Sequence, residues 1–131
     1  MNPALRLAAV VALAATAAQA QTEPIISIQF GPDRLDIAPD QILTVEGVFS
    51  QQVPYVAVTL APELQFPLAS LTLVHVGKQG AIRVCGKLIS EPLLQSPIKS
   101  ASFLITNGDY AEVRRLTAIL KARDCAPEAT S

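Results

Sequence analysis

The sequence predicts an α+β fold, in which a mostly antiparallel sheet is packed on one side by two helices in a single small domain. Three observations predict this class. Short β-branched segments are bounded by turn residues, two segments carry apolar residues at helical spacing, and strand-rich stretches each precede a helix. A chain of 131 residues is long enough for one domain.

The N-terminus has the three parts of a cleavable export signal. Residues 1–6 form a short basic region, residues 7–18 a run of small apolar residues, and Ala18-Gln19-Ala20 an A-x-A cleavage site. The competing interpretation is a membrane anchor, but the run has about a dozen residues and a bilayer span needs roughly 20. We therefore expect a signal peptide at 1–20, and a periplasmic or secreted mature protein without a transmembrane segment.

The rest of the chain divides into three parts. We expect a strand-rich segment at 21–52, an α+β domain at 53–125 and a flexible tail at 126–131. The whole chain carries 10 basic and 11 acidic residues, and the basic ones are scattered, with only Arg114-Arg115 adjacent. Because nucleic-acid binding depends on clustered basic residues, a nucleic-acid partner is not expected, and the arginine pair fits the solvated face of a helix.

Three strand candidates come before the first helix. Ile25 to Phe30 is short and β-branched, and Gly31-Pro32-Asp33 ends it as a turn. Ile42 to Phe49 has period-2 character interrupted by Gly47, so it predicts either an edge strand or a loosely packed arm. Val53 to Leu60 places alternate valines and a leucine on one face and predicts a better strand.

A first helix is predicted between Pro62 and Val76. Leucines recur there near helical spacing, and Gly77 is a suitable terminator. Pro67 must lie at the start of this helix or kink it.

Further strands follow this helix. Ala81 to Cys85 predicts a strand and Gly86-Lys87 a tight turn. Leu88 to Leu94 is the continuation of that strand or its hairpin partner, and Ser102 to Thr106 is another strand. Antiparallel pairing is the simplest arrangement for such short connections.

The last helix has the clearest pattern. Asp109 is expected to cap it, and Glu112 completes a capping-box-like pair. The buried stripe of this helix consists of Val113, Leu116, Ile119 and Leu120.

The two cysteines, Cys85 and Cys125, are an even pair in a protein that we expect to be exported. Oxidising compartments preserve disulfides, so a bridge between them is favoured over buried free thiols. Metal binding is a poor alternative, because a closed zinc site needs four ligands and His75 is the only histidine. No cofactor or metal is expected.

No catalytic constellation is evident in the sequence, so we do not expect an enzyme. His75 lies near the end of an apolar helix, where packing or exposure is favoured over a role as general base. Asp33 and Asp36 border a turn, and Gly77-Lys78-Gln79-Gly80 lacks the spacing of a phosphate loop and is interpreted as a flexible connection. The serines Ser70, Ser90 and Ser102 have neither a G-x-S-x-G turn nor a histidine placed by motif.

An ordered series of short motifs between Pro54 and Leu120 resembles the head part of the first periplasmic region of the protein-export membrane subunit SecD. The matching positions are Pro54 with Val56 to Leu60, Leu71-Thr72, Gly77, Ala81-Ile82 with Gly86, Ser90 with Pro92, and Ala111 with Leu116 and Leu120. Two features depart from the family. It usually has an acidic residue where this chain has Cys85, and its closing segment usually continues into membrane helices.

In SecD this head contacts preprotein, so the resemblance implies a non-enzymatic module that binds unfolded or translocating polypeptide in the cell envelope. The proline-interrupted segment from Lys87 to Lys99 is where we expect the contact. Its candidate binding residues are Leu88, Ile89, Leu93, Leu94 and Ile98. Two alternatives stay open: a structural or inhibitory envelope factor that binds one folded partner, and a small envelope hydrolase. The sequence leaves the oligomeric state open.

Overall fold

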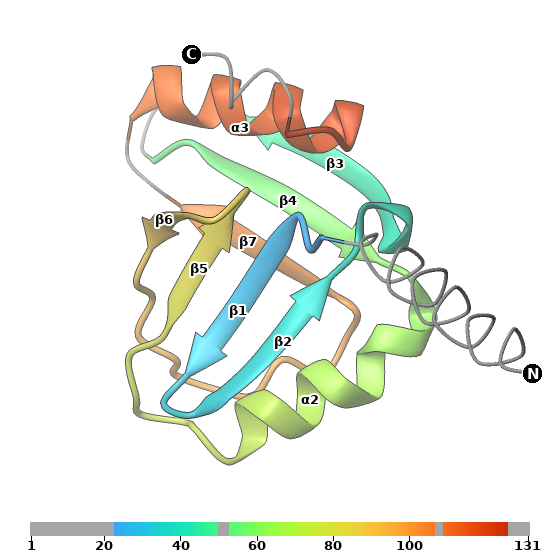
Figure 1. Cartoon of the computed structure of the whole chain (residues 1–131). Helices are drawn as coiled ribbons and strands as arrows, with labels where there is room; N and C mark the ends of the chain where they lie inside the picture. Colours follow the sequence, from blue (N-terminus) through green and yellow to red (C-terminus); the bar gives the residue numbers. More distant parts are fainter. Residues whose placement is uncertain (1–22, 50–52, 107–108, 126–131) are drawn as a thin grey trace, which may run out of the picture.

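The structure is a computed structural model that describes residues 23–49, 53–106 and 109–125. The predicted signal at 1–20 and the predicted tail at 126–131 lie outside these residues. In chain order the described elements are β1 (Ile26–Phe30), β2 (Asp33–Ile37), the 3-10 turn Pro39–Gln41, β3 (Ile42–Val48), β4 (Tyr55–Leu60), the 3-10 turn Pro62–Leu64, α2 (Gln65–Leu73), β5 (Ala81–Val84), β6 (Lys87–Ser90), β7 (Ser102–Thr106) and α3 (Tyr110–Ala122) (Figure 1).

The seven described strands form two antiparallel sheets. The first has the order β2-β1-β5-β6 and the second the order β3-β4-β7. Helix α3 packs on β3 and β4, and α2 lies along β2 at the opposite end of the molecule (Figure 1). The predicted α+β class with antiparallel pairing is confirmed, with the difference that the strands divide between two sheets.

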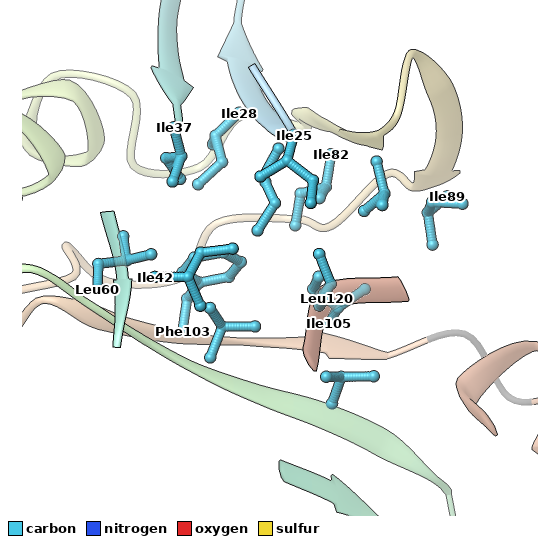
Figure 2. Close-up of a cluster of buried hydrophobic side chains, with 14 of the residues drawn as sticks. Ile25, Ile28, Ile37, Ile42, Leu60, Ile82, Ile89, Phe103, Ile105 and Leu120 are labelled. Atoms are coloured by element: carbon cyan, nitrogen blue, oxygen red, sulfur yellow. The ribbon is translucent and has the colours of Figure 1, made fainter. Parts of the chain in front are cut away.

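The core lies between the two sheets, because each contributes one apolar face. Along β1 the side chains of Ile26, Ile28 and Phe30 are buried on one face, as the period of two requires. Along β4, Val56, Val58 and Leu60 do the same. In Figure 2, Ile28 and Ile82 of the first sheet face Leu60 and Phe103 of the second, and Leu120 of α3 joins them.

Strand β2 is absent from the sequence-based prediction, which ended the first strand in a turn. The turn is correct: Gly31 takes φ 60 in the two-residue connection between Phe30 and Asp33. The chain then returns antiparallel to β1, with Leu35 opposite Ile28 and Ile37 opposite Ile26. Three of the five residues of β2 are charged, which obscured its alternation in the sequence.

The first helix is shorter than the predicted range from Pro62 to Val76. Residues Pro62–Leu64 form a 3-10 turn, α2 runs from Gln65 to Leu73, and Val74 is its C-terminal cap. Pro67 is the third residue of α2, a position where the backbone nitrogen has no acceptor within the helix.

Helix α3 begins after Asp109, as predicted, and is fixed to β3 at its C-terminal end. Arg123 takes the left-handed conformation that ends the helix, with φ 55. Its guanidinium donates hydrogen bonds to the carbonyl oxygens of Ile42 (2.9 Å) and Leu43 (3.1 Å). These bonds hold the end of α3 against the beginning of β3.

The predicted disulfide is confirmed. Cys85 lies in the β5–β6 turn and Cys125 just beyond α3, with Cα atoms 5.7 Å apart and a sequence separation of 40. The bridge therefore ties the first sheet to the helix that covers the second.

Candidate functional site

The predicted binding residues lie in two different environments. Leu88 and Ile89 belong to β6, where Leu88 is 45% exposed and Ile89 is buried. Leu93, Leu94 and Ile98 belong to the irregular segment between β6 and β7, in which Leu93 is 60% exposed and Leu94 is buried. Of the two alternatives for Leu88 to Leu94, the hairpin partner is confirmed, because β6 pairs antiparallel with β5. The strand is shorter than predicted and ends at Ser90, just before Glu91-Pro92.

Backbone hydrogen bonds hold this segment against the connection after α2. The N–H of Gly77 donates to the carbonyl of Leu94 (2.7 Å), and the N–H of Leu94 donates to the carbonyl of Lys78 (3.0 Å). The N–H of Gly80 donates to the carbonyl of Pro92 (2.9 Å). The connection interpreted as flexible is thus paired along its length.

The far end of the segment is held by a buried threonine. The N–H of Ile98 donates to the hydroxyl of Thr72 (2.9 Å), which itself donates to the carbonyl of Leu68 (2.9 Å). Since Thr72 is fully buried within α2, this contact anchors Ile98 to the helix. Leu93 and Leu94 are thereby presented on a segment that is fixed at both ends.

Three of the five predicted residues meet around an apolar cavity of about 190 Å³. Its wall combines the segment, the inner face of the first sheet and the beginning of β7. The lining residues are Ile28, Phe30, Ile82, Pro92, Leu93, Leu94, Ile98, Phe103 and Leu104. Leu88 and Ile89 do not line it.

Six of the nine lining residues were not singled out by the sequence as binding residues, and two of the six, Phe103 and Leu104, are neighbours on one strand. Both lie on β7, with Phe103 buried and Leu104 55% exposed, so their side chains point to opposite faces of the second sheet. The signal that could have found them is the apolar run Phe103 to Ile105 within the predicted strand, whose outward-facing position is a leucine.

His75 is held in a way that does not suit a general base. It is buried, stacks on Phe30 with ring centroids 5.7 Å apart, and places Nε2 2.8 Å from Oδ2 of Asp33. Its other ring nitrogen, Nδ1, is also buried and has no hydrogen-bond partner within the described residues. One nitrogen is thus engaged and the other is shut off from a substrate, so packing explains this histidine better than catalysis.

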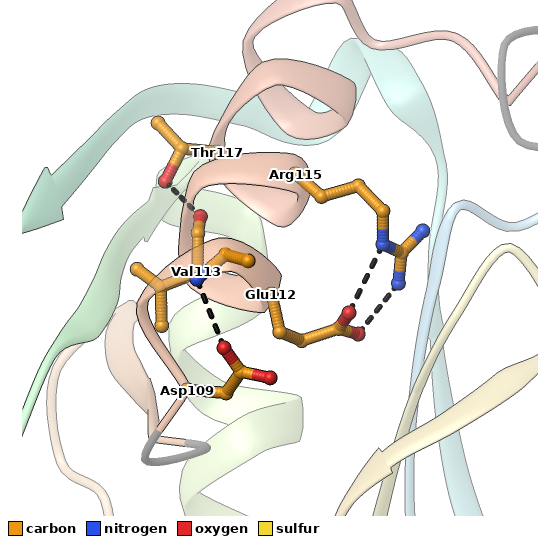
Figure 3. A network of polar contacts seen from close by, with 6 residues as sticks. Asp109, Glu112, Val113, Arg115 and Thr117 are labelled. Atoms are coloured by element: carbon orange, nitrogen blue, oxygen red, sulfur yellow. Dashed lines mark hydrogen bonds and ion pairs between the residues drawn. The ribbon is translucent and has the colours of Figure 1, made fainter.

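The acidic pair at the start of α3 is structural. Asp109 accepts a hydrogen bond from the N–H of Ala111 (2.9 Å), as an N-cap does (Figure 3). Glu112 binds Arg115 through two hydrogen bonds of 3.1 and 2.6 Å (Figure 3). The hydrogen bond from Arg115 lowers the pKa of Glu112, and the same bond raises the pKa of Arg115.

Asp36, like Asp33, makes contacts on the first sheet that explain its presence. Asp36 accepts hydrogen bonds from Nε of Arg34 (2.7 Å) and from the hydroxyl of Ser27 (3.1 Å). A hollow of about 570 Å³ opens beside them and is also lined by Arg83 and Glu23. The charged residues of this wall are two arginines, Arg34 and Arg83, and one glutamate, Glu23.

Two other kinds of feature are absent from the described ranges. No group of three or more His, Cys, Asp or Glu side chains is placed to hold a metal ion. Neither α2 nor α3 is long and apolar enough to cross a membrane.

Comparison with known proteins gives one result, at the level of the fold. No protein-family model matches the chain, and no curated protein does. The two described sheets and two described helices define an α+β module, and solved structures of SecDF contain a similar fold over about two thirds of this chain. The first, described as a membrane component that enhances protein export, has a TM-score of 0.55 and 21% identity over 66% of this chain.

A second SecDF structure, in the "Super-membrane-facing form", matches with a TM-score of 0.56 and 22% identity, again over 66% of this chain. The matches span 40% and 12% of the respective SecDF chains. The chain thus has the fold of a part of SecDF, which confirms the SecD resemblance as far as the fold.

Proposed function

We propose that this chain is an exported, non-enzymatic module that corresponds to the periplasmic head of SecD and binds unfolded or translocating polypeptide. The apolar cavity bounded by Leu93, Leu94 and Ile98 carries the proposal. The fold shared with SecDF, whose description concerns protein export, supports it.

The size and chemistry of the cavity fit one apolar side chain of a longer ligand. Its volume of about 190 Å³ lies below the range of about 300–1,000 Å³ that is usual for small-molecule pockets. Leu93 lines the cavity and is 60% exposed, so it offers apolar surface to the residues that flank the inserted side chain. A polypeptide without its own tertiary structure has such side chains available.

The test is a charge placed at the rim. We expect Leu93→Asp to weaken binding of a fluorescein-labelled nonapeptide, in which leucine and serine alternate between terminal lysines, by about tenfold or more, which corresponds to about 1.4 kcal/mol. Fluorescence anisotropy measures the dissociation constant. Leu93 is 60% exposed, so the replacement leaves the core intact.

Leu88→Asp is the matched control, because Leu88 is also exposed but does not line the cavity. It should bind the peptide as the natural protein does. Equal affinity of the Leu93→Asp protein and this control would remove the cavity from the binding site, and no binding by the natural protein would remove the proposed function.

A second candidate is a structural or inhibitory factor that binds one folded partner. It is favoured by an exposed cluster in which Phe49 and Tyr110 stack, with ring centroids 6.2 Å apart, and Arg114 lies 5.9 Å from the Phe49 ring. Aromatic and arginine side chains are enriched at the centres of protein interfaces. Photo-crosslinking from position 49 to one folded protein, with none from position 93, would favour this candidate.

A further inference from the structure

The four edges of the two sheets are protected to different degrees. Edge strands expose unpaired backbone groups, and proteins guard them with charges, prolines, short length or bulges. Strand β2 carries three charged residues in five, and β6 has only four residues, begins with Lys87 and is followed by Glu91-Pro92. Strand β3 has a register shift between Ile42 and Thr44 and is held by α3.

Strand β7 has no charge, proline or bulge that would protect its edge. Its sequence, Ser-Phe-Leu-Ile-Thr, contains no charge and no proline, and its pairing with β4 has no register shift. It is paired on one side only, because it ends the order β3-β4-β7.

The register shows which backbone groups of β7 are free. The N–H of Leu60 on β4 donates to the carbonyl of Ala101 (2.7 Å), so residue 101 directs its backbone groups toward β4. Since these groups alternate along an antiparallel strand, the N–H and C=O of Ser102, Leu104 and Thr106 point away from β4. Within the described residues, none of these backbone groups takes part in a hydrogen bond outside the sheet ladder.

The free edge and the apolar cavity lie next to each other. Phe103 and Leu104 belong to β7 and also line the cavity, together with Leu93 and Leu94 of the neighbouring segment. A ligand that paired with the edge would therefore bring one of its side chains to the cavity.

We propose that an extended polypeptide adds to β7 as a fourth strand of the second sheet. This inference rests on the proposed function, the binding of unfolded polypeptide. Its backbone bonds the free groups of Ser102, Leu104 and Thr106, and one of its apolar side chains enters the cavity. Backbone pairing supplies affinity without regard to sequence, and the cavity adds a preference for an apolar residue at one position. The unpaired N–H and C=O groups along the uncharged strand β7 can form hydrogen bonds with the backbone of an extended polypeptide.

Backbone methylation of the peptide tests this mode. We use the labelled nonapeptide and two derivatives, N-methylated at alternate residues in the two opposite phases. In an added strand, only one phase directs its N–H groups toward β7. We expect one derivative to lose binding by tenfold or more and the other to stay within about threefold of the parent.

The outcomes separate the two proposals. If both derivatives bind like the parent, the peptide binds by side chains alone, so strand addition is overturned while the proposed function stands. If the parent peptide does not bind, the proposed function fails and strand addition with it.

A protein variant gives an independent measurement. Leu104→Pro removes an N–H on the free side of β7 and leaves the bonds to β4 in place, as edge strands tolerate. Leu104→Val keeps the N–H and is the matched control. We expect the Leu104→Pro protein to bind the peptide about tenfold more weakly than the natural protein, and the Leu104→Val protein to bind it no more than about threefold more weakly. Equal affinity of the two variants would overturn strand addition. If the Leu104→Pro variant does not fold, the methylated peptides still test strand addition on the natural protein.

A second copy of this chain is the competing occupant of the edge. Sedimentation velocity measures the mass in solution. A monomer with a free edge agrees with the proposal, whereas a dimer that Leu104→Pro dissociates would show that β7 pairs with itself and would overturn the polypeptide as its partner.

Discussion

At the scale of single residues, the turn between β5 and β6 is unusual in its first position. Cys85 and Gly86 both take positive φ, 53 and 81, as the two central residues of a tight hairpin turn with the type I′ pattern. Asparagine or aspartate normally precedes the glycine there, because these side chains tolerate the left-handed region. Cysteine stands in this position because its sulfur forms the bridge to Cys125.

This arrangement predicts losses of stability of different size for two kinds of cysteine replacement. Cys125→Ala with Cys85→Ser should lower the free energy of unfolding by about 4 kcal/mol, the chain-entropy value for a loop of about 40 residues. Cys125→Ala with Cys85→Asn should recover about 0.5–1 kcal/mol of this loss, because asparagine fits the left-handed turn. Urea unfolding of both pairs measures the difference. Equal stability of the two double variants would contradict the strain at position 85.

The ion pair of Glu112 with Arg115 predicts a pH dependence. Arg115 holds the pKa of Glu112 below its ordinary value of 4.5 in the folded protein, so the pair stabilises the fold above that pH and loses its effect as pH falls through the folded pKa. Glu112→Gln should therefore lower the free energy of unfolding by up to about 0.5 kcal/mol at neutral pH, with a smaller difference near pH 3. Urea unfolding at the two pH values checks this, with Glu46→Gln on β3 as the control. A difference that grows on acidification would contradict it.

At the scale of elements, the close approach of α3 to β3 depends on Gly47. A Cβ at position 47 would lie 2.6 Å from Oγ1 of Thr117 and 3.1 Å from the Phe49 ring. The Thr117 hydroxyl is held by its hydrogen bond to the carbonyl of Val113 (2.7 Å; Figure 3), so it does not easily move aside. The glycine that interrupted the alternation in the sequence is thus the point of helix–strand contact.

A double-mutant cycle tests this contact. Gly47→Ala should destabilise the protein by about 1–3 kcal/mol through overpacking. Adding Thr117→Ala, which removes the nearest atom, should make the pair of replacements less damaging than the sum of the two single changes by at least about 0.5 kcal/mol in urea unfolding. Strict additivity would show that Thr117 is not the obstacle.

Individual elements differ in how far the sequence reveals them. Helix α3 was predictable because its cap, apolar stripe and length agree, and all are local. Strand β2 was not, because an edge strand with charges at Asp33, Arg34 and Asp36 resembles a turn region. The early end of α2 is a similar case, since Val74 and Val76 continue an apolar pattern beyond Leu73 but are exposed.

At the scale of the whole molecule, the division into two sheets could not be predicted from local patterns. The pairing of β1 with β5 joins residues far apart in sequence, such as Ile28 with Ile82, and nothing near either strand specifies it. The candidate site was predictable in part for the same reason. Leu93, Leu94 and Ile98 lie in one proline-interrupted stretch, whereas Phe30 and Phe103 reach the cavity through the packing of the two sheets.

The disulfide also determines how the molecule responds to mechanical force. Cys85 and Cys125 close a covalent ring that contains β6, the segment around Leu93, β7 and α3. Tension applied at the two ends of the chain can straighten β1 through β5 but cannot extend the ring. The disulfide thus withholds about 40 residues, or about 130–145 Å of extended chain, from the length that tension can extend. Strand β7 and the segment around Leu93 therefore lie inside a ring that tension on the chain ends cannot extend, whereas Ile28, Phe30 and Ile82 of the cavity wall lie outside it.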